Sequence, residues 1–221
     1  MVNILFDCPN IQDFKDELAP YISKDSRVTV VAFSFYDDYV YDSESWQRVY
    51  GRERGEGYFE VVDGFAAFGV SKENITYVNY FEDTKESAAR KIEEADIIYF
   101  TGGLPDRMMD RIMEFELVDA LKRFDGVVVG YSAGAVIQLK EYHLYPDGDY
   151  EDFGYYDGLG YVDSLYLEVH YEYKSEQDES IRRCLDERNL PLYVTHTRGG
   201  GIVVENGKIK TVGRVDLYER V

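Results

Sequence analysis

The stretch with the clearest capacity for chemistry is residues 130–134, Gly-Tyr-Ser-Ala-Gly. It follows an apolar run at residues 126–129, which is typical of a buried strand, and precedes residues 135–139, which favour a helix. Gly-x-Ser-x-Gly between a strand and a helix is the nucleophile-elbow pattern, in which a tight, strained turn projects the serine hydroxyl. The following helix would direct its first N–H groups at the group under attack. The pattern predicts that Ser132 is a nucleophile; a glycine-rich turn with an unreactive serine is the alternative.

A serine nucleophile needs a base, an acid that orients the base, and donors for the oxyanion. The chain has 3 histidines, at positions 143, 170 and 196. His170 ends a predicted strand, where a neighbouring loop would present it to Ser132, so we expect it to be the base. His143 lies beyond the elbow helix, and we expect it to point away from the strand ends. His196 also follows a predicted strand and stays an alternative.

The orienting acid is left open by the residues alone, because several carboxylates fall between the serine and His170: Asp147, Asp149, Glu151, Asp152 and Asp157. The oxyanion donors are better defined. The elbow geometry makes the N–H of Ala133 one donor. Gly102 or Gly103, which end another predicted strand, would supply the second, since a bare glycine backbone can approach a substrate closely. A tight turn without that role is the alternative for the two glycines.

Composition narrows the class of protein. With 221 residues the chain can bury a full core, and we expect one domain spanning residues 1–221. A net charge of −19 argues against nucleic acid and anionic membranes as partners. Cys8 and Cys184 lie far apart without metal-ligand spacing, which predicts free thiols in a reducing, cytoplasmic location. We see no signal-peptide pattern and no run of membrane-spanning length.

Predicted strands and helices alternate along the chain. The predicted strands are residues 2–6, 27–35, 74–81, 97–101, 126–130, 165–170 and 192–195. The predicted helices are residues 14–18, two within 43–68 separated by glycines, 84–95 capped by Thr84, one from Pro105 with an apolar face reaching Phe124, the elbow helix at 135–139, and 175–188. Residues 202–212 predict a hairpin with a type I′ turn at Asn206-Gly207. Residues 141–160 are acidic and rich in Tyr and Gly, with little periodicity.

This alternation predicts an α/β fold: a doubly wound, mostly parallel sheet with helices on both faces and a C-terminal β-hairpin. Ligands in such folds bind at the carboxyl ends of the strands. Both Gly102-Gly103 and Ser132 lie at predicted strand ends of this kind.

Three blocks, in this order, resemble the peptidase E and cyanophycinase family of serine peptidases: residues 99–103, residues 130–135, and residues 158–163 leading to His170. The resemblance covers most of the chain, from the second predicted strand to the closing hairpin. It implies a scaffold similar to class I glutamine amidotransferases, a flavodoxin-like arrangement. It also implies the roles of single residues: Ser132 as nucleophile, His170 as base, Asp147 as orienting acid, and Gly103 and Ala133 as oxyanion donors.

The family further implies hydrolysis of a peptide bond next to an aspartyl residue, in short peptides or cyanophycin-like polymers. No metal or other cofactor is expected, the partner is a small peptide substrate, and a homodimer is compatible with the sequence. Gly102, Arg107 and Arg198 are predicted to contribute to substrate binding.

The chain departs from the family pattern at three places. Leu104-Pro105 replace the usual Asn and Thr after the paired glycines, which removes polar groups from the substrate site. The loop at residues 195–199 has no carboxylate, whereas some members carry a glutamate there. The acidic residues 141–157 would repel an acidic substrate unless a cation compensates. Arg107, Arg111 and Arg198 are the candidate cations, with surface charge as the alternative for each; an Arg–carboxylate clamp would suit aspartyl recognition.

Serine hydrolysis is therefore the leading hypothesis. A catalytically silent relative that binds a small molecule or a protein on the same scaffold is the main alternative, favoured by the lost polar pair and opposed by the retained Ser132 and His170. An α/β-hydrolase esterase would need more chain between the serine and its acid than the fifteen positions to Asp147. A glutamine amidotransferase would need a cysteine in the elbow.

Overall fold

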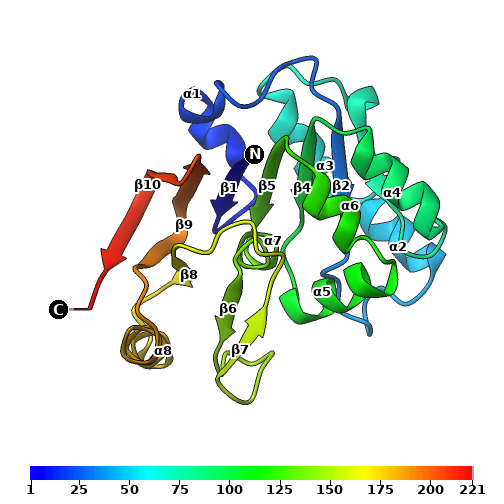
Figure 1. The fold of residues 1–221 in the computed structure, drawn as a ribbon. Helices are drawn as coiled ribbons and strands as arrows, with labels where there is room; N and C mark the ends of the chain where they lie inside the picture. Colours follow the sequence, from blue (N-terminus) through cyan, green and yellow to red (C-terminus); the bar gives the residue numbers. More distant parts are fainter. Residues whose placement is uncertain (221) are drawn as a thin grey trace.

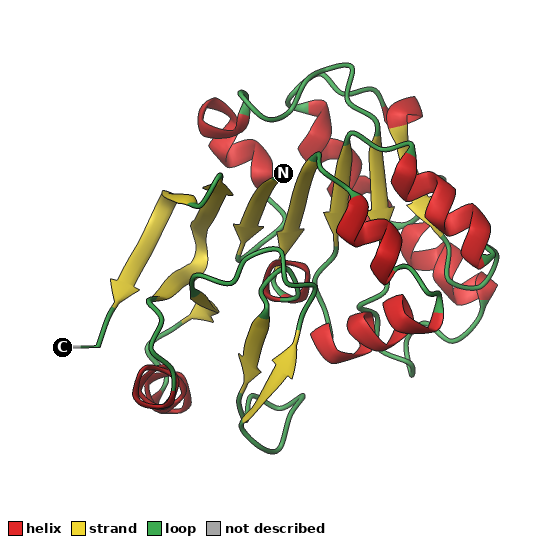
Figure 2. Ribbon diagram, viewed as in Figure 1, coloured by secondary structure: helices red, strands yellow, loops and turns green. Residues whose placement is uncertain are grey.

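The computed structural model describes residues 1–220. Its main sheet has the strand order β10-β9-β1-β5-β4-β2-β3, and β8 also pairs with β9 (Figures 1 and 2). The strands are β1 (Val2–Phe6), β2 (Val28–Val31), β3 (Ile75–Val78), β4 (Ile97–Phe100), β5 (Val127–Tyr131), β8 (Tyr166–Tyr171), β9 (Leu192–Glu205) and β10 (Lys208–Tyr218). Strands β1 to β5 pair in parallel, and β9 runs antiparallel to β1 and β10. The predicted mostly parallel sheet is confirmed.

Helices cover both faces of this sheet. One face carries α4 (Lys85–Glu93), α5 (Pro105–Glu114), α6 (Val118–Arg123) and α7 (Ala133–Val136); the other carries α1 (Lys15–Leu18), α2 (Ser43–Tyr50) and α3 (Glu56–Ala66). Two 3₁₀ turns, η1 (Ile11–Phe14) and η2 (Lys72–Asn74), complete this part. Successive strand residues alternate between the two cores: Leu5 packs with α4–α7, and Ile4 and Phe6 pack with the opposite helices. This confirms the doubly wound prediction.

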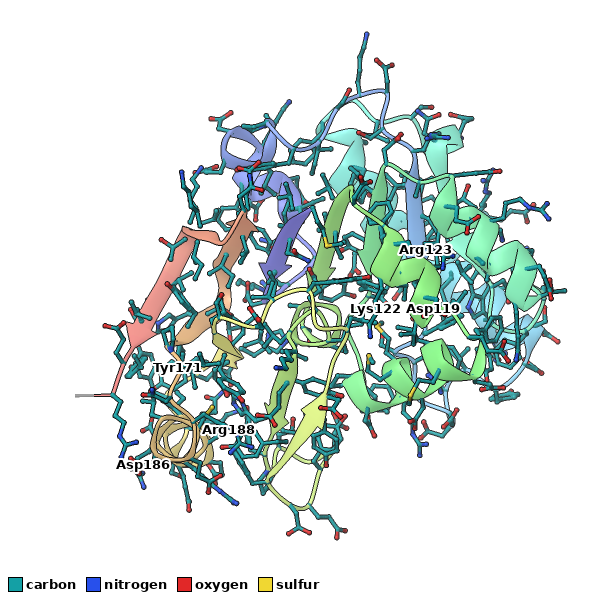
Figure 3. The ribbon with its side chains drawn as sticks, viewed as in Figure 1. Asp119, Lys122, Arg123, Tyr171, Asp186 and Arg188 are labelled. Carbon is teal, nitrogen blue, oxygen red and sulfur yellow. The ribbon has the colours of Figure 1, made fainter. Side chains whose placement is uncertain are left out.

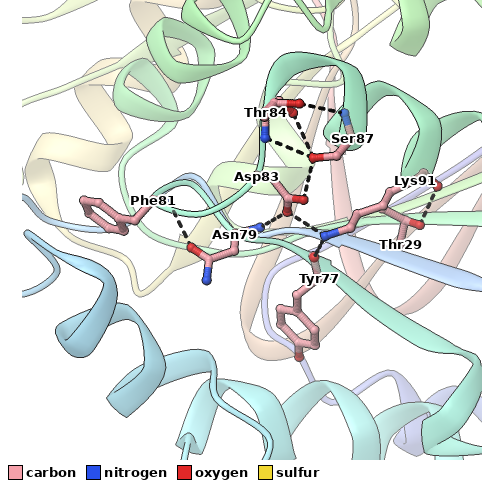
Figure 4. A network of polar contacts seen from close by, with 8 residues as sticks. All are labelled: Thr29, Tyr77, Asn79, Phe81, Asp83, Thr84, Ser87 and Lys91. Carbon is pink, nitrogen blue, oxygen red and sulfur yellow. Dashed lines mark hydrogen bonds and ion pairs between the residues drawn. The ribbon is translucent and has the colours of Figure 1, made fainter.

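The end of β3 is fastened to α4 by a polar network (Figure 4). The Thr84 hydroxyl accepts the Ser87 N–H at 3.2 Å, and the Ser87 hydroxyl accepts the Thr84 N–H at 3.0 Å, a reciprocal cap of the helix. Asp83 accepts from Lys91 Nζ at 2.6 Å, and the same Nζ donates to the Tyr77 carbonyl at 2.9 Å. The predicted Thr84 cap is confirmed.

Two predicted helices differ in detail. Residues 43–68 divide into α2 and α3, as predicted, because Gly51 and Gly55 lie in extended backbone between them. The helix predicted from Pro105 to Phe124 is instead two helices, α5 and α6, since Glu116 adopts a φ of 54° and ends the first. Met113, predicted on the apolar face, is 53% exposed. The methionine lies on the outer side of α5.

Two further regions differ from the elements predicted from the sequence. Residues 141–160, where the sequence shows little periodicity and predicts no strand, contain a second sheet of β6 (Glu141–Leu144) and β7 (Gly154–Asp157). Residues 192–195 and 202–205 form one long strand, β9, whose first part pairs with β8 and whose last part pairs with β1. The hairpin of β9 and β10 is confirmed, with φ of 50° at Asn206 and 73° at Gly207, as a type I′ turn requires.

The β6–β7 hairpin is anchored on α8 (Ser175–Glu187). Arg188, labelled in Figure 3, extends from the end of α8 and donates from Nε to Glu141 of β6 at 2.7 Å. The Arg183 guanidinium lies 4.2 Å from the centre of the Phe153 ring. These contacts hold the hairpin below the carboxyl ends of the parallel strands in the view of Figure 1.

Cys8 and Cys184 are both free thiols, as predicted. Within residues 1–220, no helix has the length and apolar character needed to cross a membrane.

Candidate active site

A cavity of about 330 Å³ lies where β5 meets α7. We call it the Ser132 cavity. Its lining residues come from the sheet ends, the β6–β7 hairpin and β8, and include Gly103, Pro105, Ser132, Ala133, His143, Tyr145, Asp147, Asp149, Tyr150, Glu168 and His170. A larger depression of about 700 Å³ lies between α2 and the edge strand β3, and it holds none of the predicted catalytic residues. The smaller cavity is therefore the candidate active site, because the predicted catalytic residues line it.

The turn that carries Ser132 is fixed by steric demands. Ser132 has a φ of 51° and a ψ of −117°, outside the regions that a non-glycine residue ordinarily adopts. A Cβ on Gly130 would lie 2.0 Å from the Gly134 carbonyl oxygen, and one on Gly134 would lie 2.3 Å from the Phe100 carbonyl oxygen. Only glycine fits either position. The Ser132 N–H donates to the Phe6 carbonyl at 2.9 Å, which ties the strained turn to β1.

Two backbone N–H groups are available beside the serine. Ala133 is the first residue of α7, and Gly103 follows β4, the strand that neighbours β5. Within residues 1–220 neither N–H donates to an acceptor. Gly103 has a φ of 134°, and a Cβ there would lie 2.2 Å from the Ser34 carbonyl oxygen. The structure therefore places Gly103 and Ala133 on the same cavity as Ser132, with free donors.

His170 lines the cavity from β8, within the stretch where the pairing of β8 with β9 shifts register, and has a φ of 56°. Gln177 of α8 holds this irregular stretch, since its Nε2 donates to the His170 carbonyl at 2.9 Å and its Oε1 accepts the Glu172 N–H at 2.8 Å. His170 is solvent-exposed as a whole residue, but desolvation by the surrounding protein lowers its pKa below the usual value. The charges of Asp7 and Glu168 oppose that shift. The imidazole therefore favours the neutral form that a general base needs. No hydrogen bond between His170 and the Ser132 hydroxyl is present in residues 1–220.

His143 contradicts the sequence prediction, because it contributes to the wall of the Ser132 cavity rather than pointing away from it. Its Nε2 lies 2.9 Å from Glu168 Oε2, and both side chains are almost fully buried. Burial would lower the pKa of His143, but its neighbours Cys184 and Glu168 outweigh that effect and raise it. The reason for the error is the β6–β7 pairing, which turns the chain back toward the strand ends. His143 and Glu168 form a buried ion pair behind the cavity surface.

The predicted acid, Asp147, lies in the loop of the hairpin and lines the cavity. Its Oδ1 accepts the N–H groups of Asp149 at 2.9 Å and Tyr150 at 3.2 Å, while its Oδ2 has no partner among the described residues. No hydrogen bond joins it to His170 in this part of the chain. Asp147 therefore has one free oxygen within the same cavity as the base.

Sequence reasoning missed Asp7, whose charge has the largest opposing effect on the pKa of His170. Asp7 is fully buried at the end of β1 and accepts the N–H groups of Gly199 and Gly200, each at 3.3 Å. The sequence feature that could have identified Asp7 is its position directly after the first predicted strand, since ligands in such folds bind at the strand ends.

The third histidine, His196, is buried beside Asp216, with Nε2 2.7 Å from Oδ2, and it does not line the cavity.

The three candidate arginines lie outside the cavity lining. Arg111 is buried, donates to the Phe35 carbonyl at 2.8 Å and to Asp37 at 2.6 Å, and stacks 3.6 Å from the Phe35 ring centre. Arg107 is exposed and lies 3.8 Å from Asp37. Arg198 is exposed. Arg111 therefore holds the segment after β2, and the other two lie on the surface.

Gly102 packs under Tyr131, and a Cβ there would lie 2.4 Å from that ring. Pro105 lines the cavity, and the Leu104 N–H donates to the Ser34 carbonyl at 2.7 Å. This part of the wall thus lacks the polar side chains that the family pattern supplies. Within residues 1–220, no group of three or more His, Cys, Asp or Glu side chains is arranged to hold a metal ion.

The fold and the turn at Ser132 define an α/β protein with a doubly wound, mostly parallel sheet and a serine at a strand-to-helix turn. The sequence model of peptidase family S51 matches residues 54–212, and the chain belongs to this family of serine peptidases.

Solved structures support the fold. A candidate peptidase E from Listeria monocytogenes EGD-e matches with a TM-score of 0.66 at 14% identity, over 96% of this chain and 98% of that one. A peptidase from an acI-B1 Actinobacterium matches with a TM-score of 0.60 at 15% identity, over 99% and 93%. No curated protein sequence matches the chain significantly.

Proposed function

We propose that this protein hydrolyses short peptides through an acyl-enzyme formed on Ser132. The observation that carries the proposal is the meeting of Ser132, His170 and the free N–H groups of Gly103 and Ala133 on one cavity. A peptide carbonyl bound there would face a nucleophile, a base and two oxyanion donors. Membership of a serine peptidase family supports this use of the residues.

In the proposed reaction, His170 takes the proton of the Ser132 hydroxyl while Oγ attacks the carbonyl carbon. The oxyanion that forms accepts hydrogen bonds from the N–H groups of Gly103 and Ala133. Collapse of the tetrahedral intermediate breaks the C–N bond, and His170 returns its proton to the leaving amine. A water molecule, deprotonated by His170, then hydrolyses the ester and frees Ser132.

Asp147 is the proposed orienting acid, supported by its place on the cavity and its unpartnered Oδ2. Gly102, Arg107 and Arg198 remain proposed substrate-binding residues, of which Gly102 lies closest in sequence to the proposed donor Gly103. A cytoplasmic location and a homodimer also remain proposals.

The test is labelling with a fluorophosphonate probe, which reacts with a serine activated by a base and an oxyanion hole. We expect the unaltered protein to be labelled and Ser132→Ala to be unlabelled. His170→Ala should reduce the labelling rate by at least about a hundredfold, because general-base assistance is worth that much or more. His196→Ala is the matched control, since that histidine is outside the cavity, and it should still be labelled. Circular dichroism of each variant establishes that it is folded.

A catalytically silent binding protein is the second candidate. It is favoured by one observation: within residues 1–220, no hydrogen bonds link Ser132 to His170 or His170 to Asp147. Catalytic hydrogen bonds in substrate-free enzymes are often formed only when substrate binds, so this observation does not outweigh the shared cavity. A folded protein that the probe leaves unlabelled would favour this second candidate.

A further inference from the structure

The charge of the Ser132 cavity is opposite to what an aspartyl substrate needs. Asp147, Asp149 and Glu168 contribute carboxylates to its lining, and no lysine or arginine of residues 1–220 does so. The cationic group in the lining is His143, which already pairs with Glu168. A carboxylate placed in this cavity would meet the negative charges of Asp147 and Asp149, which no cation in the described lining balances.

A second observation points to a ligand of the opposite sign. Glu168 is 2% exposed, and its Oε1 has no hydrogen-bond partner among the described residues, although Oε2 is bound to His143. Buried carboxylate oxygens normally have partners, because an unmet acceptor costs about 1–3 kcal/mol. Glu168 is one of the residues that line the cavity, so this carboxylate lies at the edge of the space that a substrate would occupy.

One candidate for a compensating cation near the hairpin, Arg183, is already engaged. Arg183 lies behind the hairpin, in a separate depression with Phe153, Glu176 and Glu179. Its Nε donates to Glu187 at 2.7 Å and its guanidinium stacks on Phe153. Arg111, the buried arginine, is likewise committed to Asp37 and to backbone carbonyls.

We infer that the Ser132 cavity binds a positively charged group on the acyl-side residue of its peptide substrate, through Asp149 and Glu168, and disfavours an aspartyl residue. The group is a lysine or arginine side chain or the α-ammonium of an N-terminal residue. This inference rests on the proposed function, since it assumes that Ser132 attacks the carbonyl of that residue. The cavity, at about 330 Å³, lies at the small end of ordinary ligand sites, in keeping with a short peptide.

The experiment compares dipeptides Lys-Leu, Met-Leu and Asp-Leu, each with a free and an acetylated N-terminus. The side chains of lysine and methionine have similar length, so the ratio of kcat/KM for Lys-Leu to kcat/KM for Met-Leu reports the effect of the charge. We expect kcat/KM to fall about tenfold from Lys-Leu to Met-Leu and about tenfold again to Asp-Leu, as expected for about 1.4 kcal/mol of charge interaction per step. High salt should narrow both ratios. If acetylation leaves the lysine preference intact, the side chain is the bound group; if acetylation abolishes it, the α-ammonium is.

Two variants test whether Asp149 and Glu168 produce the preference for a cationic substrate residue. Asp149→Asn and Glu168→Gln should each lower the Lys-to-Asp ratio of kcat/KM by about threefold to tenfold, from the loss of one charge. Asp152→Asn is the control, because it removes a carboxylate from the same hairpin outside the cavity lining, and it should leave the ratio unchanged. Thermal melts show whether Glu168→Gln, which alters a buried pair, is folded; Asp149→Asn tests the same claim at an exposed site.

The outcomes separate this inference from the proposed function. Equal or faster cleavage of Asp-Leu than of Met-Leu would overturn the inference while leaving the serine peptidase intact. If the probe labels Ser132 but no dipeptide is cleaved, the same peptides are tested for protection of Ser132 from the probe, and stronger protection by Asp-Leu would overturn the inference. A folded protein without any labelling would contradict the proposed function itself.

Discussion

The Ser132 cavity has two walls that are held in different ways. The sheet wall, formed by Gly103, Ser132 and Ala133, is fixed by backbone contacts: tight glycines and the hydrogen bond from Ser132 to Phe6. The hairpin wall, formed by residues 143–150, is held by side chains. Tyr36 donates to Asp149 at 2.7 Å, and Tyr150 donates to Asp106 at 2.7 Å. The contrast suggests that the sheet wall supplies the reaction and the hairpin wall supplies substrate choice.

The largest effect expected on the hairpin wall is that of Asp147. Asp147→Asn should lower kcat by up to about 10⁴-fold if this residue orients His170, as with the corresponding change in a known triad. Steady-state hydrolysis of a cleaved dipeptide measures this, with Asp152→Asn as the surface control. If Asp147→Asn keeps its activity and Asp7→Asn loses it, the orienting acid is Asp7, at the end of β1. The hairpin wall would then contribute to substrate choice and not to the reaction.

The next prediction compares Gly134, which follows the sheet wall in the chain, with Gly148 in the loop of the hairpin wall. Gly134→Ala should lower the free energy of unfolding by about 3 kcal/mol or more, because its Cβ would lie 2.3 Å from a backbone oxygen that cannot move freely. Gly148→Ala, in the hairpin loop, has no atom within 4 Å and should cost only about 1–2 kcal/mol, from its φ of 107°. Urea unfolding of both variants measures the difference. Equal losses would contradict the account of a rigid sheet wall.

The pH profile tests the state of His170. Burial lowers the pKa of this group, so its neutral form persists below the ordinary value of about 6.5. Because the base must be unprotonated, kcat/KM should rise with pH, with an acid limb centred below about 6.5, and fall about tenfold per unit beneath that limb. An acid limb well above pH 7 would show that a different group, with a raised pKa such as that of His143, limits the reaction.

The smallest effect concerns the side-chain contacts of the hairpin. Tyr36→Phe removes the hydrogen bond to Asp149 and should lower the free energy of unfolding by about 1 kcal/mol or less. Tyr39→Phe is the matched control, since Tyr39 is 68% exposed and its hydroxyl makes no hydrogen bond within residues 1–220. Hydrogen exchange should show faster opening of the loop after β6 in Tyr36→Phe alone. Unchanged exchange would argue that this contact does not hold the hairpin wall.

The sheet wall could be predicted from the sequence because its constraints are local. Glycines that flank Ser132, and an apolar β-branched run before it, specify the turn without reference to distant residues. The alternation of strands and helices likewise predicted the doubly wound sheet. Local signals also identified the Thr84 cap and the Asn206-Gly207 turn.

The hairpin wall could not be predicted in the same way. Residues 141–157 show no clear alternation, because β6 and β7 are short and their tyrosines and acids lie in contacts with α8 and with the segment after β2. His143 was therefore assigned to the wrong side of the chain. Asp7 was missed because its effect on His170 joins two strand ends that are far apart in sequence. Long-range side-chain placement is what the sequence pattern leaves undetermined.

The most direct test of the central claim is to trap the acyl-enzyme. A slowly released ester substrate is mixed with the protein, quenched in acid, and the digested protein is examined by mass spectrometry. We predict an acyl adduct on the peptide that contains Ser132, formed in a burst stoichiometric with enzyme, and absent from Ser132→Ala. Hydrolysis that continues in Ser132→Ala, with no adduct on the unaltered protein, would contradict the account.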